Sequence, residues 1–287
     1  MTVLVEAPAK VNLSLRVSDR DASGLHPLRS LVQMISWYDI LELAFADEDT
    51  LALDPPSAGI PDGGDNLVWR AVAWHRRLIP CRERLGIVLR KRISIAAGLG
   101  GGSSDAAATV VGLDELTHRS SRSGDLAELG ADVPFARLGG SAWMEGYGDI
   151  LSVREVVSDY ALVIAVPPLE LATVDVYARW DRLDGPQGPA MTGRALPPSL
   201  RGEAPLINDL YPAAISLAAE LADYRSDLSA AWQRPVAMSG SGPSLFAFFA
   251  DADEAAAAAN ELDGPYRAVE AVVPIDHGAR IVEIRDR

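Results

Sequence analysis

The opening segment of the chain alternates between apolar and polar side chains over residues 11–17. A period of two is typical of a half-buried strand, with one face toward the core and the other toward solvent. The same alternation places Lys10 and Asn12 side by side on the polar face. Shorter apolar runs at residues 40–45 and 85–89 predict two further strands.

Helical patterns lie between these strand-like runs. Apolar side chains recur at helical spacing over residues 66–78, and the alanine-rich residues 103–116 open with Ser-Ser-Asp, which are good helix-capping residues. The second half of the chain predicts helices at 210–221 and 252–262 and strands at 245–249 and 268–273.

Strands and helices are mixed in both halves of the chain, which favours the α+β class. A length of 287 residues allows two domains. We place the boundary between residues 150 and 160 and expect an N-terminal domain over 1–154 and a C-terminal domain over 155–287. Residues 185–205 are rich in proline and glycine and predict a loop or a mobile hairpin.

The charge balance narrows the class of partner. The chain has 26 Lys and Arg residues against 40 Asp and Glu residues, a formal charge of −14. This field disfavours non-specific binding to nucleic acid or to an anionic membrane. The charge therefore disfavours nucleic-acid and membrane partners. Separately from the charge, we expect a small-molecule substrate, and a monomer or a homodimer.

Other absences exclude further classes of protein. A single cysteine, Cys81, excludes an intrachain disulfide and a multi-cysteine zinc site, and the four histidines do not form an H-E-x-x-H motif. The first residues lack a signal-peptide pattern, and no uncharged apolar run reaches the roughly 18 residues that a membrane span needs. We expect a cytoplasmic protein.

The strongest chemical signal is the sequence AGLGGGSSDAA at residues 97–107. Three glycines between a predicted strand and a predicted helix let backbone N–H groups approach phosphate oxygens, and the helix N-terminus adds a favourable dipole. The stretch is neither a Walker A loop nor G-x-G-x-x-G, because Ser103 replaces the third glycine. Taken alone, it fits a glycine-rich turn with an ordinary helix cap equally well.

Two more segments contain residues that could take part in catalysis. Residues 238–244 are also glycine-rich, but by themselves they fit a plain turn better, and Ser239 replaces the first glycine of a G-x-S-x-G nucleophile elbow, which disfavours a serine hydrolase. Asp132, with Pro134 two residues later, fits a helix N-cap. The same aspartate could equally serve as a general base.

Basic residues gather locally within this acidic chain. Residues 70–92 hold eight Lys or Arg and one Glu, which could serve an anionic ligand. Lys91, seven residues before Gly98, is the best candidate to reach it. Lys10 and Lys91 are also the only two lysines among the 26 cationic residues. Four arginines fit a solvated helix face instead: Arg76, Arg77, Arg82 and Arg84.

These motifs together resemble the GHMP kinase superfamily and, within it, the 4-diphosphocytidyl-2-C-methyl-D-erythritol kinases. The resemblance covers nearly the whole chain, and its most specific part is the long glycine loop. The segments that carry it, in order, are residues 8–13, 24–28, 65–68, 97–107, 130–135, 208–212 and 238–244.

The resemblance implies two α+β domains with an active site in the cleft between them, where ATP, with Mg²⁺, phosphorylates a hydroxyl group. By matching position, Asp132 would be the catalytic carboxylate and Lys10 its partner. The nucleotide would be bound by Asn66, Lys91, Ala97, Gly98, Leu99, Gly100, Gly101, Gly102, Ser103 and Ser104. The acceptor would be bound by Asn12, His26, Thr173, Tyr177 and Gly240. In that set, His26 would hydrogen-bond a cytosine and Tyr177 would stack on it.

The chain departs from the family pattern at two positions. Leu25 stands where the family has a tyrosine next to the histidine, and Ser94 stands where it has a proline. The loss of an aromatic wall at Leu25 bears on specificity for cytidine. Leu25 favours one alternative, a GHMP kinase for another alcohol. Two further alternatives stay open, although the intact motifs disfavour them: a catalytically silent nucleotide-binding regulator, and a phosphorylation-coupled decarboxylase.

Overall fold

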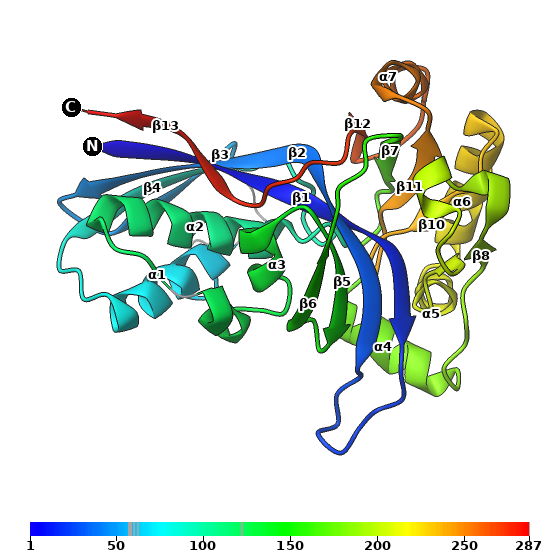
Figure 1. The fold of residues 1–287 in the computed structure, drawn as a ribbon, viewed down its shortest axis with the longest axis horizontal. Coiled ribbons are helices and arrows are strands. Elements are labelled where there is room, and N and C mark those ends of the chain that lie inside the picture. The colour runs from blue at the N-terminus through cyan, green and yellow to red at the C-terminus, as the bar shows by residue number, and fades with distance from the viewer. Residues whose placement is uncertain (57–58, 60, 62, 122, 287) are drawn as a thin grey trace.

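The computed structural model describes residues 1–56, 59, 61, 63–121 and 123–286. The described residues form a seven-stranded sheet, a four-stranded sheet and a small two-stranded sheet, together with helices (Figure 1). The larger, seven-stranded sheet has the order β13-β1-β2-β4-β3, with β5 paired to β2 and β6 paired to β5. Its strands are β1 (Thr2–Val17), β2 (Leu28–Ala46), β3 (Thr50–Asp54), β4 (Arg84–Arg90), β5 (Ser141–Gly146), β6 (Ile150–Arg154) and β13 (Arg280–Arg285).

The long hairpin of β1 and β2 is the framework of the molecule. The predicted strand at 11–17 is the second half of β1. It is buried on both faces as far as Leu15, so the expected half-buried strand with a polar face toward solvent is wrong. The reason is that segments from the second half of the chain cover the face that the polar residues occupy. Ser14 Oγ contacts the backbone of Ile207, and the backbone N–H of Asn12 donates to the Ser239 hydroxyl.

Three helices pack along one face of this sheet: α1 (Leu67–Leu78), α2 (Gly101–Thr117) and α3 (Val133–Leu138), with the 3-10 helix η1 (Ser123–Glu128) beside them (Figure 1). Small alanine side chains let α2 lie close to the sheet. The predicted helix at 103–116 begins two residues earlier than expected, at Gly101. Gly100 occupies the N-cap position, so Ser103, Ser104 and Asp105 lie inside the helix and do not cap it.

The second sheet has the order β10-β11-β7-β12 and is antiparallel throughout. The predicted helix at 210–221 is two helices, because the backbone is extended at Ala218. The sheet consists of β7 (Ala161–Val166), β10 (Ala237–Met238), β11 (Leu245–Phe249) and β12 (Ala268–Val272), and its helices are α4 (Thr173–Arg182), α5 (Tyr211–Leu217), α6 (Glu220–Trp232) and α7 (Ala252–Asn260).

The proline- and glycine-rich residues 185–205 are anchored to the body of the protein. Here β8 (Ala190–Met191) pairs with β9 (Leu206–Ile207), and the short 3-10 helices η2 (Gly193–Ala195) and η3 (Pro198–Leu200) lie between them. Leucines of this segment are buried in the core cluster that lies between the two sheets. A hairpin is thus present, and it is packed against that core.

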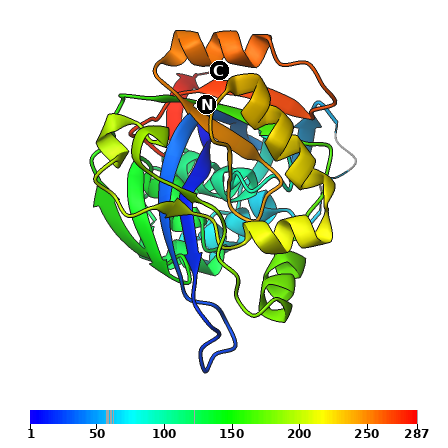
Figure 2. The same ribbon diagram turned by 90° about the vertical axis from the view of Figure 1, so that its right-hand side faces the viewer.

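The chain crosses between the two halves more than once. β13 returns to pair with β1, so the expected C-terminal domain over 155–287 gives its last strand to the first sheet. In the other direction, the β1–β2 hairpin projects past its own sheet, and its tip lies beside α4 (Figures 1 and 2). In the described part of the chain, no helix is long and apolar enough to cross a membrane.

Candidate active site

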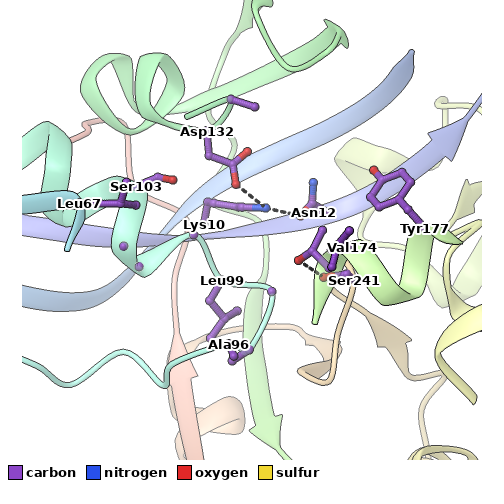
Figure 3. Close-up of a pocket in the computed structure, with 18 of the residues that line it drawn as sticks. Lys10, Asn12, Leu67, Ala96, Leu99, Ser103, Asp132, Val174, Tyr177 and Ser241 are labelled. Carbon is purple, nitrogen blue, oxygen red and sulfur yellow. Dashed lines mark hydrogen bonds and ion pairs between the residues drawn. The ribbon is translucent and has the colours of Figure 1, made fainter. Parts of the chain in front are cut away.

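A cavity of about 1060 Å³ lies where the hairpin, the long glycine loop, α3 and α4 meet (Figure 3). Every site residue predicted from the sequence lines it, with the exception of Ser104. The side chain of Ser104 is buried, and no hydrogen-bond partner for its hydroxyl exists among the described residues. The structure therefore brings the predicted nucleotide and acceptor residues together around one space.

Lys10 and Asp132 face each other across this cavity. The Lys10 Nζ lies 3.3 Å from Asp132 Oδ2 and 2.5 Å from Asn12 Oδ1. Asp132 occupies the N-cap position of α3, as expected, but its carboxylate makes no capping hydrogen bond within the described residues. Instead it points toward Lys10 (Figure 3). Because the Asp132 carboxylate is not used in capping the helix, it is available for chemistry in the cavity.

A chain of hydrogen bonds orients Asn12. The Ser30 hydroxyl donates to the Ser14 carbonyl oxygen at 2.6 Å, so its oxygen accepts from Asn12 Nδ2 at 2.7 Å. That leaves Asn12 Oδ1 directed at Lys10. The buried strands β1 and β2 thus fix the direction in which the ammonium group points.

The glycine loop is shaped around Lys10. Gly100 has φ 69°, and a Cβ atom there would lie only 2.9 Å from Lys10 Cγ. The first intrahelical hydrogen bond of α2 runs from Ser104 N to Gly100 O, so the N–H groups of residues 101–103 precede the helical ladder. Such N–H groups at a helix N-terminus are suited to phosphate oxygens.

The second glycine-rich segment, residues 238–244, is a wall of the site and more than a plain turn. The Ser239 hydroxyl donates to Gly98 O at 3.0 Å and accepts from Asn12 N at 3.1 Å. Asn208 Nδ2 donates to two carbonyl oxygens of the segment, those of Met238 and Gly240. Sequence reasoning did not assign Ser239 and Asn208 to the site, although both lie in motifs that carried the resemblance.

Gly98 is the point of closest approach between the two glycine-rich segments. It has φ +75°, and a Cβ atom there would lie 2.4 Å from Ser239 O.

We therefore expect Gly98→Ala to lower the free energy of unfolding by about 2 kcal/mol or more and to weaken ATP binding. Urea unfolding and calorimetric titration with ATP measure the two effects. Gly202→Ala is the matched control, because no atom lies within 4 Å of its Cβ position. Equal stability of the two variants would contradict this packing.

His26 and Tyr177 meet at the other end of the cavity. Their rings stack with centroids 5.6 Å apart, and the edge of Trp180 packs against His26. His26 Nδ1 faces the Ser18 carbonyl at 2.8 Å, while Nε2 lies 3.0 Å from Asp181 Oδ1. Burial, with a smaller effect of the nearby Asp132 charge, raises the pKa of Tyr177 to about 12, so its phenol stays protonated at neutral pH.

Lys91, the predicted candidate to reach an anionic ligand, lines the cavity and is paired with acidic side chains. Its Nζ lies 2.5 Å from Asp39 Oδ2 and 2.6 Å from Asp105 Oδ2, so both neighbours are carboxylates. Sequence reasoning missed both aspartates. Asp105 lies within the glycine motif itself, whereas Asp39 is brought to the site by β2 and carries no local signal.

The remaining predicted residues have structural partners at the cavity wall. Asn66 caps α1, because its Oδ1 accepts from Val68 N at 2.9 Å. Thr173 is the first residue of α4, and its hydroxyl lies 2.9 Å from that of Ser241. Leu25 is 56% exposed and lines the cavity next to His26.

The chain is similar to known kinases along nearly its whole length. Residues 66–149 match the GHMP kinases N terminal domain, and residues 205–268 match the GHMP kinases C terminal domain. A 4-diphosphocytidyl-2-C-methyl-D-erythritol kinase of Geobacter metallireducens is 35% identical, with 91% of this chain and 94% of the relative covered. The chain belongs to this kinase family.

Two further comparisons agree with that assignment. The kinase of the same name from Nocardia farcinica is 37% identical, with 98% of this chain and 96% of the relative covered. A crystal structure of 4-(cytidine 5'-diphospho)-2C-methyl-D-erythritol kinase superposes with a TM-score of 0.77 at 34% identity, with 96% of this chain and 99% of that chain covered. The expected two-part α+β GHMP kinase fold is confirmed, and the protein is an ATP-dependent phosphotransferase that acts on an alcohol.

Proposed function

We propose that this protein transfers the γ-phosphoryl group of ATP to the 2-hydroxyl of 4-diphosphocytidyl-2-C-methyl-D-erythritol. The two relatives described above are named as kinases of this compound. The observation that carries the proposal in the structure is the pair of Lys10 and Asp132, held between the glycine loop on one side and the His26–Tyr177 stack on the other.

The geometry supports a direct transfer. The acceptor oxygen bonds to the γ-phosphorus as the bond from that phosphorus to the bridging oxygen of ADP breaks, and Asp132 accepts the hydroxyl proton. The Lys10 ammonium, 3.3 Å from Asp132, stabilises negative charge that develops on the acceptor oxygen. Asn12 holds the ammonium in that direction.

The long glycine loop supplies the phosphate site. The backbone N–H groups of residues 101–103 and the N-terminal end of α2 favour the charge of the ATP phosphates. Mg²⁺ would neutralise part of that charge. Within the described residues, no group of three or more His, Cys, Asp or Glu side chains could hold a metal ion. A Mg²⁺ ion that arrives with ATP would be bound mainly by phosphate oxygens and water.

The far end of the cavity fits a flat, polar base. Tyr177 offers an aromatic face, and its protonated phenol offers a hydrogen-bond donor. His26 covers one face of Tyr177, so a cytosine stacked on Tyr177 would use the other face. Leu25 lines this cavity with an aliphatic side chain at the position where the family has a tyrosine.

Incubation of the purified protein with ATP, Mg²⁺ and the cytidine-bearing substrate tests the proposal directly. We expect release of ADP that depends on the acceptor and a product with one added phosphate on the erythritol. A panel of other alcohols, among them methylerythritol without the cytidine diphosphate, identifies a different acceptor. ATP binding without turnover on any alcohol would contradict the proposal and favour the silent regulator.

The missing aromatic wall gives a specificity prediction. We expect Leu25→Tyr to lower the KM for the cytidine-bearing substrate about threefold to tenfold, because a stacked aromatic pair adds about 0.5–1.5 kcal/mol. Steady-state kinetics with varied acceptor measure it. Leu78→Tyr is the matched control, since Leu78 is similarly exposed at the end of α1, away from the cavity. A KM that is unchanged or higher would place the base elsewhere.

A further inference from the structure

Three buried charged side chains form a cluster behind the glycine loop. Lys91 Nζ donates to Asp39 Oδ2 at 2.5 Å and to Asp105 Oδ2 at 2.6 Å. The side chains are 10%, 0% and 5% exposed for Lys91, Asp39 and Asp105. Two carboxylates and one ammonium carry a net charge of −1 when all are ionised. A net charge is costly in a site with so little access to water.

The surroundings of the two aspartates show which one carries a proton. Asp39 accepts from Lys91 and, through Oδ1, from the backbone N–H groups of Arg92 at 2.6 Å and Ile93 at 2.8 Å. Asp105 accepts from Lys91 alone among the described residues, and its buried Oδ1 has no hydrogen-bond partner there. A carboxylate with three donors is a stable anion, so the proton resides on Asp105.

The electrostatic balance agrees with this assignment. Burial, increased by the charge of Asp39 and opposed by that of Lys91, raises the pKa of Asp105 to about 7. Burial alone would lower the pKa of Lys91, but the charges of Asp105 and Asp39 outweigh burial and raise it. Lys91 therefore stays charged at neutral pH while Asp105 titrates.

The cluster lies directly behind the phosphate site. A Cβ atom on Gly101, the first residue of α2, would be 3.1 Å from Lys91 Nζ. Asp105 is on the same helix, about one turn further along. A negative charge on the cluster therefore lowers the positive potential at the N-terminus of α2, whereas a neutral cluster leaves it unchanged.

Lys10 and His75, which lie on elements packed against α2, each pair with an aspartate. On β1, Lys10 lies against Gly100 and pairs with Asp132 of α3. On α1, which packs along α2, His75 pairs with Asp114 further along α2. The charges that act on Asp105 itself come from Lys91 and Asp39.

We propose that Asp105 is a positioning residue for ATP, which supports the phosphate site in its protonated form and weakens it when it ionises. In the protonated form, the cluster is neutral and leaves the positive field of α2 intact. In the ionised form, a net negative charge lies behind the N–H groups that face the phosphates and repels them. This inference rests on the proposed use of ATP, and it deepens that function by making nucleotide affinity depend on pH.

Calorimetric titration with Mg²⁺–ATP tests the inference without turnover. Between about pH 6 and about pH 8.5, we expect the Kd of the wild type to rise about fivefold relative to that of Asp105→Asn. The variant is the control for titration of the ATP phosphate itself, which acts on both proteins. Asp114→Asn, on the same helix and outside the cavity, should keep the wild-type dependence. A constant ratio of wild-type and Asp105→Asn Kd values would overturn the proposal.

Unfolding by urea gives a readout that needs no nucleotide. The pKa of Asp105 is higher in the folded state than its ordinary value of 3.8, so its contribution to stability is present at low pH and is lost as the pH rises through about 7. We therefore expect Asp105→Asn to gain stability relative to the wild type from about pH 5 to about pH 8. If Asp39→Asn showed this gain instead, the proton would be on the wrong aspartate in our assignment.

The two kinds of failure are distinguishable. Absence of acceptor-dependent ADP release at every pH would contradict the proposed function, while the Kd and unfolding measurements would still decide the role of Asp105. A normal kinase whose ATP affinity and stability respond to pH in the same way with and without Asp105 would contradict the inference alone.

Discussion

Asp132→Asn is expected to lower kcat by about a thousandfold or more while leaving the KM for ATP within about twofold. Asparagine has the size of aspartate but cannot accept the hydroxyl proton, and it removes the ion pair with Lys10. The effect on ATP should be small, because the glycine loop and α2, rather than Asp132, face the phosphates.

Steady-state kinetics with each substrate varied in turn separate these effects. Asp175→Asn is the matched control, since Asp175 is exposed in the first turn of α4 and does not line the cavity. Turnover close to that of the wild type in Asp132→Asn would remove this carboxylate from the mechanism. A large rise in the KM for ATP would show that it acts in nucleotide binding instead.

Lys10→Arg is expected to lower kcat by about a hundredfold or more, although the charge is kept. The Lys10 stem fits closely against Gly100, where even one added carbon atom would lie 2.9 Å from Cγ. The wider guanidinium cannot occupy this space and point at Asp132 with the same geometry.

The kcat of Lys10→Arg should be measured together with its urea unfolding curve, so that lost activity is not mistaken for lost folding. Arg70→Lys, on the exposed side of α1, is the reverse exchange away from the cavity and should be close to the wild type. Near-normal turnover in Lys10→Arg would mean that a positive charge suffices at this position, whatever its shape.

Local pattern predicted the elements that build the site, but not how much of each is buried. The alternation in residues 11–17 correctly indicated a strand, yet the second layer that covers its polar side comes from residues almost two hundred positions away. The start of α2 was misplaced by two residues because a helix that begins with glycines has no side-chain cap to read.

The predicted site residues gather in one cavity, and the remaining surprises concern their partners. Lys91 was identified from its charge and its distance to the loop in sequence, which say nothing of the two buried aspartates beside it. Residues 238–244 resembled an ordinary turn because their partner, Gly98, lies in the other half of the chain. Contacts between distant segments leave little trace in a single sequence.

The pairing of β13 with β1 has a consequence for synthesis. Residues 2–6 leave the ribosome well before their partners at 280–285, which follow them by more than 270 residues of chain. The outer edge of β1 thus stays open until β13 is made, and an open strand edge can pair with the wrong strand. The larger sheet becomes complete only after β13 has been made, so the strand that carries Lys10 gains this neighbour long after it is itself synthesised.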